Sequence, residues 1–208
     1  MPSRRSMLQI QDMISYIPLS YDGDLIDRVS GNVIELSGNG SMVWDATEGM
    51  YLITNPATIG QYVGRIAINN YPYKFPLNSF TSMGQIKRKS TTGYNSTPYC
   101  STTASGAATQ VSYNNSANLA NFPANTLVKS ANVIDHQNTN RKYYQQGTLY
   151  GAVAEHTPYL PSNWSATGYV YFGYVATSVN YSTEYWVKEI YLFNRVLTAE
   201  EIYKIQGY

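Results

Sequence analysis

The sequence is poor in charge, in cysteine and in long hydrophobic runs. Charged side chains make up 13% of its 208 residues, about half of the roughly 25% found in an ordinary soluble domain. The 14 lysines and arginines are balanced by 13 aspartates and glutamates, which leaves a net charge of +1 and argues against a basic face for nucleic acid. No stretch approaches the ~18 consecutive apolar residues of a membrane-spanning helix. We therefore expect neither nucleic-acid binding nor membrane insertion.

The sequence also has few of the residues that bind metals or form disulfides. Cys100 is the single cysteine, so no intrachain disulfide can form, and with two histidines a zinc site of about four ligands is not expected. The densest acidic cluster is a predicted turn with Asp22, Asp24 and Asp27, whose alternating oxygen ligands suit calcium. The competing interpretation, which we favour, is a solvated turn that caps its own backbone. Calcium is thus the one cofactor that the sequence raises.

The sequence is rich in the residues of a β-protein. Apolar residues make up 43% of the chain and aromatic residues 14%, with 21 tyrosines, which is enough to bury a core and excludes disorder. Short apolar segments alternate with Gly, Asn and Pro, the pattern of an antiparallel sandwich. The expected strands are 17–21, 33–36, 42–44, 50–53, 59–68, 110–113, 127–129, 132–135, 141–145, 148–153, 169–174 and 185–193.

The remaining segments are an arm, a loop region and a helix. Residues 1–14 are expected to form an N-terminal arm ahead of one domain at 15–208. Apolar residues recur at helical spacing from Met7 to Ile17 and stop at Pro18, which fits either a helix on a neighbouring surface or a turn docked on its own domain. Residues 70–126 are expected to be long sandwich loops, and such loops usually carry function or an interface.

Three segments, in chain order, resemble one family. They are Tyr21–Asp24 with Asp27–Asn32, the hairpin Arg141–Gly147, and the closing strand and helix start Lys188–Ile202. Together they are similar to the concanavalin A-like, laminin-G-like jelly rolls. The resemblance implies an all-β, two-sheet antiparallel jelly-roll sandwich that ends in a short helix.

The closing segment of this resemblance has a structural interpretation. Asn194 and Arg195 end the last strand, and Thr198 with Glu201 forms a capping box for the helix. Family members that bind calcium use acidic residues near the ends of the sandwich. This chain has Lys188 where the family often has Asp, which puts that site in doubt.

The sequence offers little enzyme chemistry. A retaining glycosidase needs two carboxylates about 5 Å apart, but the acids in the predicted strands are isolated from one another. The chain also lacks a Gly-x-Ser-x-Gly elbow and a phosphate-binding loop. We therefore expect a protein that is not an enzyme, with no catalytic residues.

Sugar binding and protein contact both remain open for the loop aromatics. Aromatic rings stack on sugars, but they are also enriched at subunit contacts, which we favour here. Trp44 and Trp186, in contrast, lie in predicted strands and are expected in the core. The candidate contact residues for a carbohydrate or a partner are Tyr71, Tyr73, Tyr94, Tyr99, Trp164 and Tyr181.

These observations lead to two hypotheses about function. The chain starts with Met, shows no export signal and resembles a fold usually found outside cells. The first hypothesis is a structural protein of a phage particle, such as a capsid decoration protein or head fibre, assembled in the host cytoplasm. It would contact other virion proteins or its own copies, with glycan adhesion as an addition. The alternative is a carbohydrate-binding, lectin-like module of a phage adhesin or a bacterial surface protein, extracellular or at the cell surface.

Overall fold

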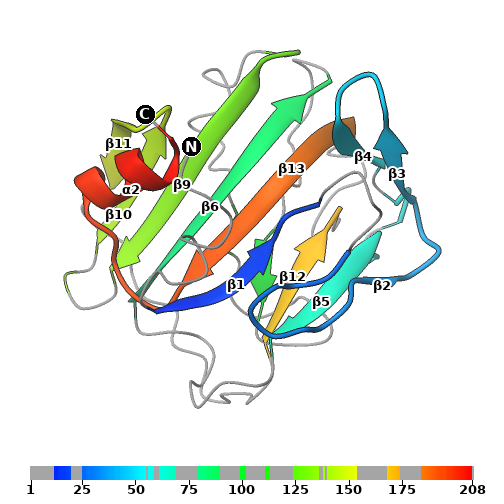
Figure 1. The fold of residues 1–208 in the computed structure, drawn as a ribbon, viewed down its shortest axis with the longest axis horizontal. Helices are drawn as coiled ribbons and strands as arrows, with labels where there is room; N and C mark the ends of the chain where they lie inside the picture. The colour runs from blue at the N-terminus through cyan, green and yellow to red at the C-terminus, as the bar shows by residue number, and fades with distance from the viewer. Residues whose placement is uncertain are drawn as a thin grey trace.

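The computed structural model shows two antiparallel sheets and one short C-terminal helix (Figure 1). The predicted β-sandwich class is therefore confirmed. None of the described helices is long and apolar enough to cross a membrane. The structure describes residues 12–19, 25–54, 56–58, 61–68, 79–89, 99–101, 111–112, 124–135, 138, 140–153, 168–173 and 184–207.

The larger sheet has eight strands in the order β11-β10-β9-β6-β13-β4-β3, with β1 also paired to β13. The smaller sheet has five strands in the order β2-β5-β12-β7-β8. The strands of the larger sheet are β1 (Met13–Ile17), β3 (Ser41–Asp45), β4 (Met50–Thr54), β6 (Ser79–Arg88), β9 (Leu127–Asp135), β10 (Asn140–Gln145), β11 (Thr148–Val153) and β13 (Glu184–Phe193). Those of the smaller sheet are β2 (Glu35–Leu36), β5 (Gly64–Ile68), β7 (Tyr99–Ser101), β8 (Val111–Ser112) and β12 (Gly168–Phe172).

Strand β13 organises the larger sheet. It pairs with β6 on one side, while its first half pairs with β4 and its second half with β1. The pairing with β6 shifts register between Val187 and Glu189. A bulge of this kind reverses the alternation of side chains along a strand. Val187 before it and Ile190 after it therefore both face the core between the sheets.

The main core lies between the two sheets. Ile66 of β5 and Phe172 of β12 pack in one buried cluster with Ile53, Ile86 and Leu192 of the larger sheet. A second cluster lies on the other face of the larger sheet. It is covered by α2 (Ala199–Ile205), which follows β13 and lies over β9 and β10 in Figure 1.

Helix α2 begins as predicted. Thr198 is its N-cap, and the Thr198 hydroxyl accepts a hydrogen bond from the Glu201 N–H. The Glu201 carboxylate in turn accepts from the Thr198 N–H, which completes the capping box. Asn194 follows the last residue of β13, and its N–H donates to the Asp12 carbonyl just before β1. The predicted structural motif Asn194, Arg195, Thr198 and Glu201 thus lies at the junction between β13 and α2.

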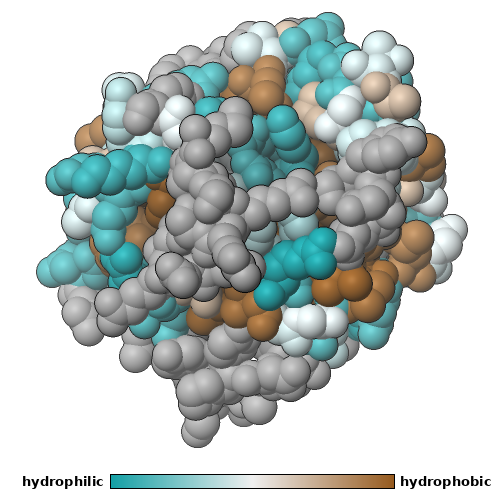
Figure 2. Space-filling model, viewed as in Figure 1, coloured by the Kyte–Doolittle hydropathy of each residue, from teal (hydrophilic) through white to brown (hydrophobic). Residues whose placement is uncertain are grey.

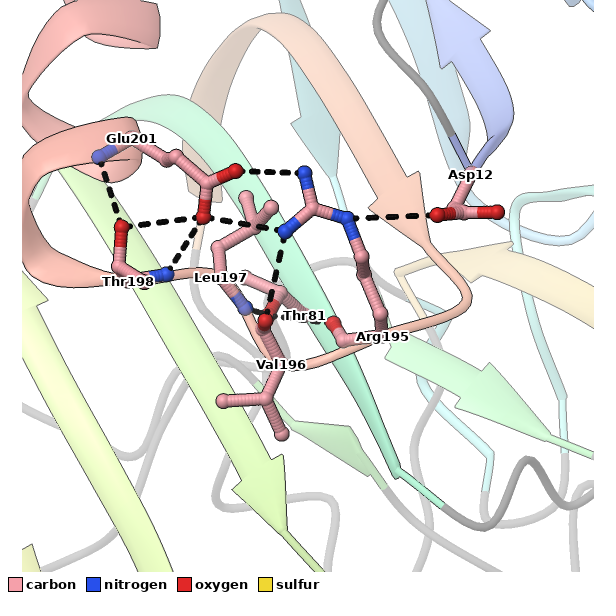
Figure 3. A network of polar contacts seen from close by, with 7 residues as sticks. All are labelled: Asp12, Thr81, Arg195, Val196, Leu197, Thr198 and Glu201. Carbon is pink, nitrogen blue, oxygen red and sulfur yellow. Dashed lines mark hydrogen bonds and ion pairs between the residues drawn. The ribbon is translucent and has the colours of Figure 1, made fainter.

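One arginine joins this junction together (Figure 3). Arg195 bonds the Glu201 carboxylate through two nitrogens and lies 3.5 Å from the Asp12 carboxylate. The Thr81 hydroxyl of β6 donates to the Arg195 carbonyl and accepts from the Leu197 N–H, each at 2.9 Å. The last strand, the helix, β1 and β6 are therefore tied at one point.

One expectation about the chain's organisation is wrong, and at Met13–Ile17 the helix alternative for the arm is excluded. Residues 70–126 were expected to be loops, but Ser79–Arg88 is the ten-residue strand β6 inside the larger sheet. It is buried on both faces, so its sequence lacks the alternation that marks a half-buried strand. The helical spacing that runs to Ile17 ends in strand β1, not in a helix, because pairing with β13 buries all five of its residues. The rest of the arm lies outside the described residues.

Candidate functional site

The strongest candidate site is the outer face of the smaller sheet. Ile66 and Phe172 point into the core, so Arg65 and Tyr171, their neighbours along β5 and β12, face away from it. Arg65 is opposite Tyr171 in the β5–β12 register and opposite Glu35 in the β2–β5 register. Tyr62 and Tyr169 are partly buried and pack against Tyr171. We call the set Glu35, Tyr62, Arg65, Tyr169 and Tyr171 the tyrosine–arginine site.

Arg65 lies against two aromatic rings of this site. Its guanidinium carbon is 4.8 Å from the ring centroid of Tyr169 and 5.5 Å from that of Tyr62. Tyr171 meets the Tyr62 ring edge to face at 5.2 Å and the Tyr169 ring at a tilt, 5.9 Å apart. These separations are typical of cation–π and aromatic pairs. The three rings therefore hold the guanidinium in one position.

A carboxylate completes the site. The Arg65 Nε donates to the Glu35 Oε2 at 2.9 Å. The Arg65 side chain is 23% exposed and that of Glu35 is 62% exposed, so the pair lies at the surface with the arginine on the inner side. In Figure 2, hydrophobic and hydrophilic residues are intermixed over the part of the surface where Figure 1 places β2 and β5.

Arg65 stays charged and Tyr171 stays neutral at ordinary pH. Burial raises the pKa of Tyr171 to about 12, although the adjacent Arg65 opposes the shift. Burial also acts to lower the pKa of Arg65, but the hydrogen bond to Glu35 and the nearby tyrosines outweigh it, so the pKa is raised. The site therefore holds a permanently charged guanidinium beside the neutral, fully buried phenol of Tyr171.

This arrangement suits binding more than chemistry. It joins apolar rings to a few fixed polar groups, as small-molecule sites do, and it contains no paired carboxylates or activated nucleophile. Among the residues that the structure describes, no three His, Cys, Asp or Glu side chains gather so as to hold a metal ion.

Most of the predicted contact residues lie outside the described part of the chain. This applies to Tyr71, Tyr73, Tyr94, Trp164 and Tyr181, which stay predictions. Tyr99 begins β7, and its backbone pairs with Tyr171 of β12. Its strand therefore runs beside the tyrosine–arginine site.

The predicted calcium turn is only partly described. Asp22 and Asp24 lie outside the described residues. Asp27 is fully buried, and its Oδ1 accepts hydrogen bonds from the backbone N–H groups of Tyr16 and Val29, both at 2.9 Å. The bond to Val29, two residues on, is the turn-capping contact of an aspartate. At Asp27 the backbone capping agrees with the turn interpretation, but the side chain is buried and not solvated.

The two strand tryptophans differ in position. Trp44 packs against the core between the sheets, as predicted. Trp186 is 7% exposed, but its Nε1 donates to Asp45 Oδ2 at 2.9 Å, and Lys87 Nζ lies 5.0 Å from its ring. Lys87 also bonds Glu48 at 2.6 Å. This second set of aromatic ring, cation and carboxylate provides a matched comparison for the tyrosine–arginine site.

The sequence interpretation missed the tyrosine–arginine site because its residues fall inside predicted strands. Arg65 and Glu35 are 30 positions apart, so Glu35 was counted as an isolated acid. The available signal was Arg65 in the otherwise apolar run Gly64–Ile68 and the alternating Tyr169 and Tyr171. Outward-facing aromatic residues on a strand next to an arginine indicate a sheet face that is only partly exposed to solvent.

Comparisons with known proteins show that this chain shares its fold with solved structures. Neither a scan of protein-family models nor a search of curated proteins finds a match. Among solved structures, the chain is similar to the binding domain of botulinum neurotoxin serotype D, with a TM-score of 0.61 and 10% identity. It is also similar to the binding domain of botulinum neurotoxin DC in complex with rat synaptotagmin II, with a TM-score of 0.60 and 13% identity. A third similar structure is that of botulinum neurotoxin type C, whose cell entry depends on interaction with two ganglioside molecules, with a TM-score of 0.59 and 13% identity.

Each of these matches covers 94% of this chain and 51% of the other. The chain thus spans about half the length of the toxin structures that it resembles. At 10–13% identity the likeness establishes a shared β-sandwich fold. It transfers no site residue to this chain.

Proposed function

We propose that this protein is a non-enzymatic recognition domain that binds glycans through the tyrosine–arginine site. The observation that carries the proposal is the position of Arg65, held against the rings of Tyr62 and Tyr169 and paired with the exposed Glu35. This proposal follows the lectin-like alternative of the sequence interpretation. A structural role in a phage particle stays a separate prediction.

A glycan is the ligand class that this mixture of groups fits best. A sugar ring has apolar C–H faces and a rim of hydroxyls that both donate and accept hydrogen bonds. Tyrosine rings offer matching apolar surface, while a guanidinium offers up to five donors and a carboxylate only acceptors. A site with these three types in contact can bind both parts of a sugar at once.

The comparisons support a binding role for the fold. Two of the similar structures are binding domains, and cell entry of a third similar protein, botulinum neurotoxin type C, depends on gangliosides, which carry glycans. The likeness covers about half of each toxin structure. Glycan binding by this chain is therefore our own proposal. It rests on the tyrosine–arginine site.

The test is binding of the full chain to an array of neutral and acidic glycans. We expect Tyr62→Ala and Arg65→Ala each to reduce binding of the recognised glycans at least tenfold, since each removes a wall of the site. The controls are Tyr203→Ala, which removes a 48% exposed tyrosine from α2, and Lys87→Ala, which removes the matched cation beside Trp186. Both should bind as the unaltered protein does.

Unfolding is checked by circular dichroism, and Tyr62→Leu and Arg65→Gln replace any alanine variant that fails to fold. The proposal is contradicted if the Tyr62 and Arg65 variants bind the glycans as tightly as the two control variants and the unaltered protein do. It is also contradicted if the unaltered protein binds nothing on the array.

A further inference from the structure

We infer that the glycan recognised at the tyrosine–arginine site is acidic, and that its carboxylate binds Arg65 in place of Glu35. This inference rests on the proposed function and names the ligand class. The structural basis is the unequal burial of the two partners. Arg65 is fixed and mostly covered, whereas Glu35 is mostly exposed.

Arg65 gives the smaller sheet its one positive charge. Among the residues in the strands of this sheet, Arg65 is the single cation and Glu35 the single anion. The aromatic and small residues around them carry no charge at neutral pH. An anionic ligand that approaches this face therefore meets one guanidinium, and one carboxylate competes for it.

The bond between Arg65 and Glu35 uses one nitrogen of the guanidinium, which also has a side-chain hydrogen bond to Tyr171. The described contact joins one nitrogen, Nε, to one carboxylate oxygen, Oε2. A guanidinium is a planar fork that binds a carboxylate best through two parallel hydrogen bonds. A carboxylate held at a single point can be replaced by one that bonds at two.

Exposure makes that replacement cheap. A surface ion pair contributes little to stability, and Glu35, at 62% exposure, recovers its hydration when it turns away. Arg65 does not need to move, because the Tyr62 and Tyr169 rings hold it in position. A ligand carboxylate thus meets a donor that is already oriented.

The pair beside Trp186 shows the contrast. There Lys87 is 15% exposed and its partner Glu48 is 27% exposed, so both partners are covered. A lysine ammonium is also a point charge without the fork that selects a carboxylate. The same three types of group are present, but this second set is closed and lacks an exchangeable partner.

The experiment measures the affinity of the full chain for sialyllactose, lactose and sulfated lactose by titration. These three probes share the lactose core: sulfated lactose adds a sulfate, and sialyllactose adds a sialic acid residue that carries a carboxylate. We expect sialyllactose to bind at least tenfold more tightly than lactose. Sulfated lactose should fall between the two, because a tetrahedral sulfate matches the planar fork less well than a carboxylate does.

Two variants decide whether Arg65 and Glu35 act as proposed. Arg65→Lys keeps the charge but loses the fork, and it should weaken sialyllactose binding about tenfold. Glu35→Gln removes the competing anion and should strengthen sialyllactose binding severalfold. Glu48→Gln makes the same change in net charge away from the site and should not alter this affinity.

The outcomes separate this inference from the proposed function. If lactose binds as tightly as sialyllactose and Arg65→Ala still abolishes binding, the site binds glycans but the acidic specificity is wrong. If Glu35→Gln weakens sialyllactose, Glu35 contacts the ligand and the exchange is wrong. If none of these probes and no glycan on the array binds, both the inference and the proposed function fail.

Discussion

Arg195 and Glu201 form a two-point ion pair between the end of β13 and the first turn of α2. Nη1 of Arg195 donates to Oε2 of Glu201 at 3.0 Å, and Nη2 donates to Oε1 at 2.7 Å. The same carboxylate receives the Thr198 N–H of the capping box. One glutamate therefore fixes both the start of the helix and its angle to the last strand, a relationship seen in Figure 3.

We expect Arg195→Ala to lower the free energy of unfolding by roughly 1–2 kcal/mol. Charge-assisted bonds of this kind contribute about 1.5–3 kcal/mol when buried, and the partial exposure of both side chains reduces that figure. The measurement is urea unfolding followed by circular dichroism. The control is Lys204→Ala, which breaks an exposed pair with Glu200 and should lower the free energy of unfolding clearly less. Equal losses in the two variants would show that the Arg195 pair has no special role.

Stability should fall in acid through Glu201. The hydrogen bonds from Arg195, with smaller contributions from Thr198, lower the pKa of Glu201 from 4.5 to about 2. Because the pKa is lower in the folded state, the stabilisation is complete above pH 4.5 and is lost as the pH falls toward about 2. The free energy of unfolding is measured between pH 6 and 2. The difference between the unaltered protein and Glu201→Gln should be largest near neutral pH and shrink through this window; a constant difference would contradict the assignment.

Removal of two neighbouring hydroxyls on β6 should affect stability differently. Thr81 is buried, and its hydroxyl bonds both the Arg195 carbonyl and the Leu197 N–H. Thr81→Val keeps the shape but leaves these groups unpaired, which should cost about 1–3 kcal/mol. Ser82, on the other face, is 4% exposed and its hydroxyl has no hydrogen-bond partner in the structure. Ser82→Ala should therefore be neutral or slightly stabilising in thermal and urea unfolding, and a large loss there would show that its hydroxyl has a structural role.

The turn before β3 provides a test of backbone geometry. Gly40 has φ +81°, and a Cβ there would lie 2.4 Å from the Thr54 carbonyl oxygen and 2.8 Å from a Val63 methyl. Gly38 has a similar φ of +77°, but a Cβ there meets nothing within 4 Å. Gly38→Ala should thus cost about 1 kcal/mol from conformation alone. Gly40→Ala should cost clearly more, because Thr54 backbone must also move; equal melting temperatures of the two variants would contradict this.

Local sequence patterns predicted the regular parts of the fold. The hairpin Arg141–Val153 and the capping box at Thr198 depend on short-range rules of turns and helix ends, and both are confirmed. The segments 127–129 and 132–135, predicted separately, form the single strand β9. Polar Ser130 interrupts the apolar pattern, but pairing with β6 continues through it.

Prediction failed where burial comes from distant parts of the chain. Strand β6 has the polar sequence of a loop, yet it lies between β9 and β13, whose paired residues follow it by 40 to 56 and by 97 to 112 positions. Met13 to Ile17 have helical spacing, but β13 offers an edge to pair with. Backbone hydrogen bonds and burial at such an edge outweigh local propensity.

The sequence by itself determined that the protein is an antiparallel β-sandwich closed by a capped helix, because strand alternation, turn residues and the Thr198–Glu201 box act over a few residues. The tertiary structure alone decided where charge meets aromatic rings. It brought Glu35 and Arg65 together with Tyr169 and Tyr171, since strand register between segments far apart in the chain fixes which side chains share a face. The scarcity of charge is what makes that one arginine distinctive on its sheet.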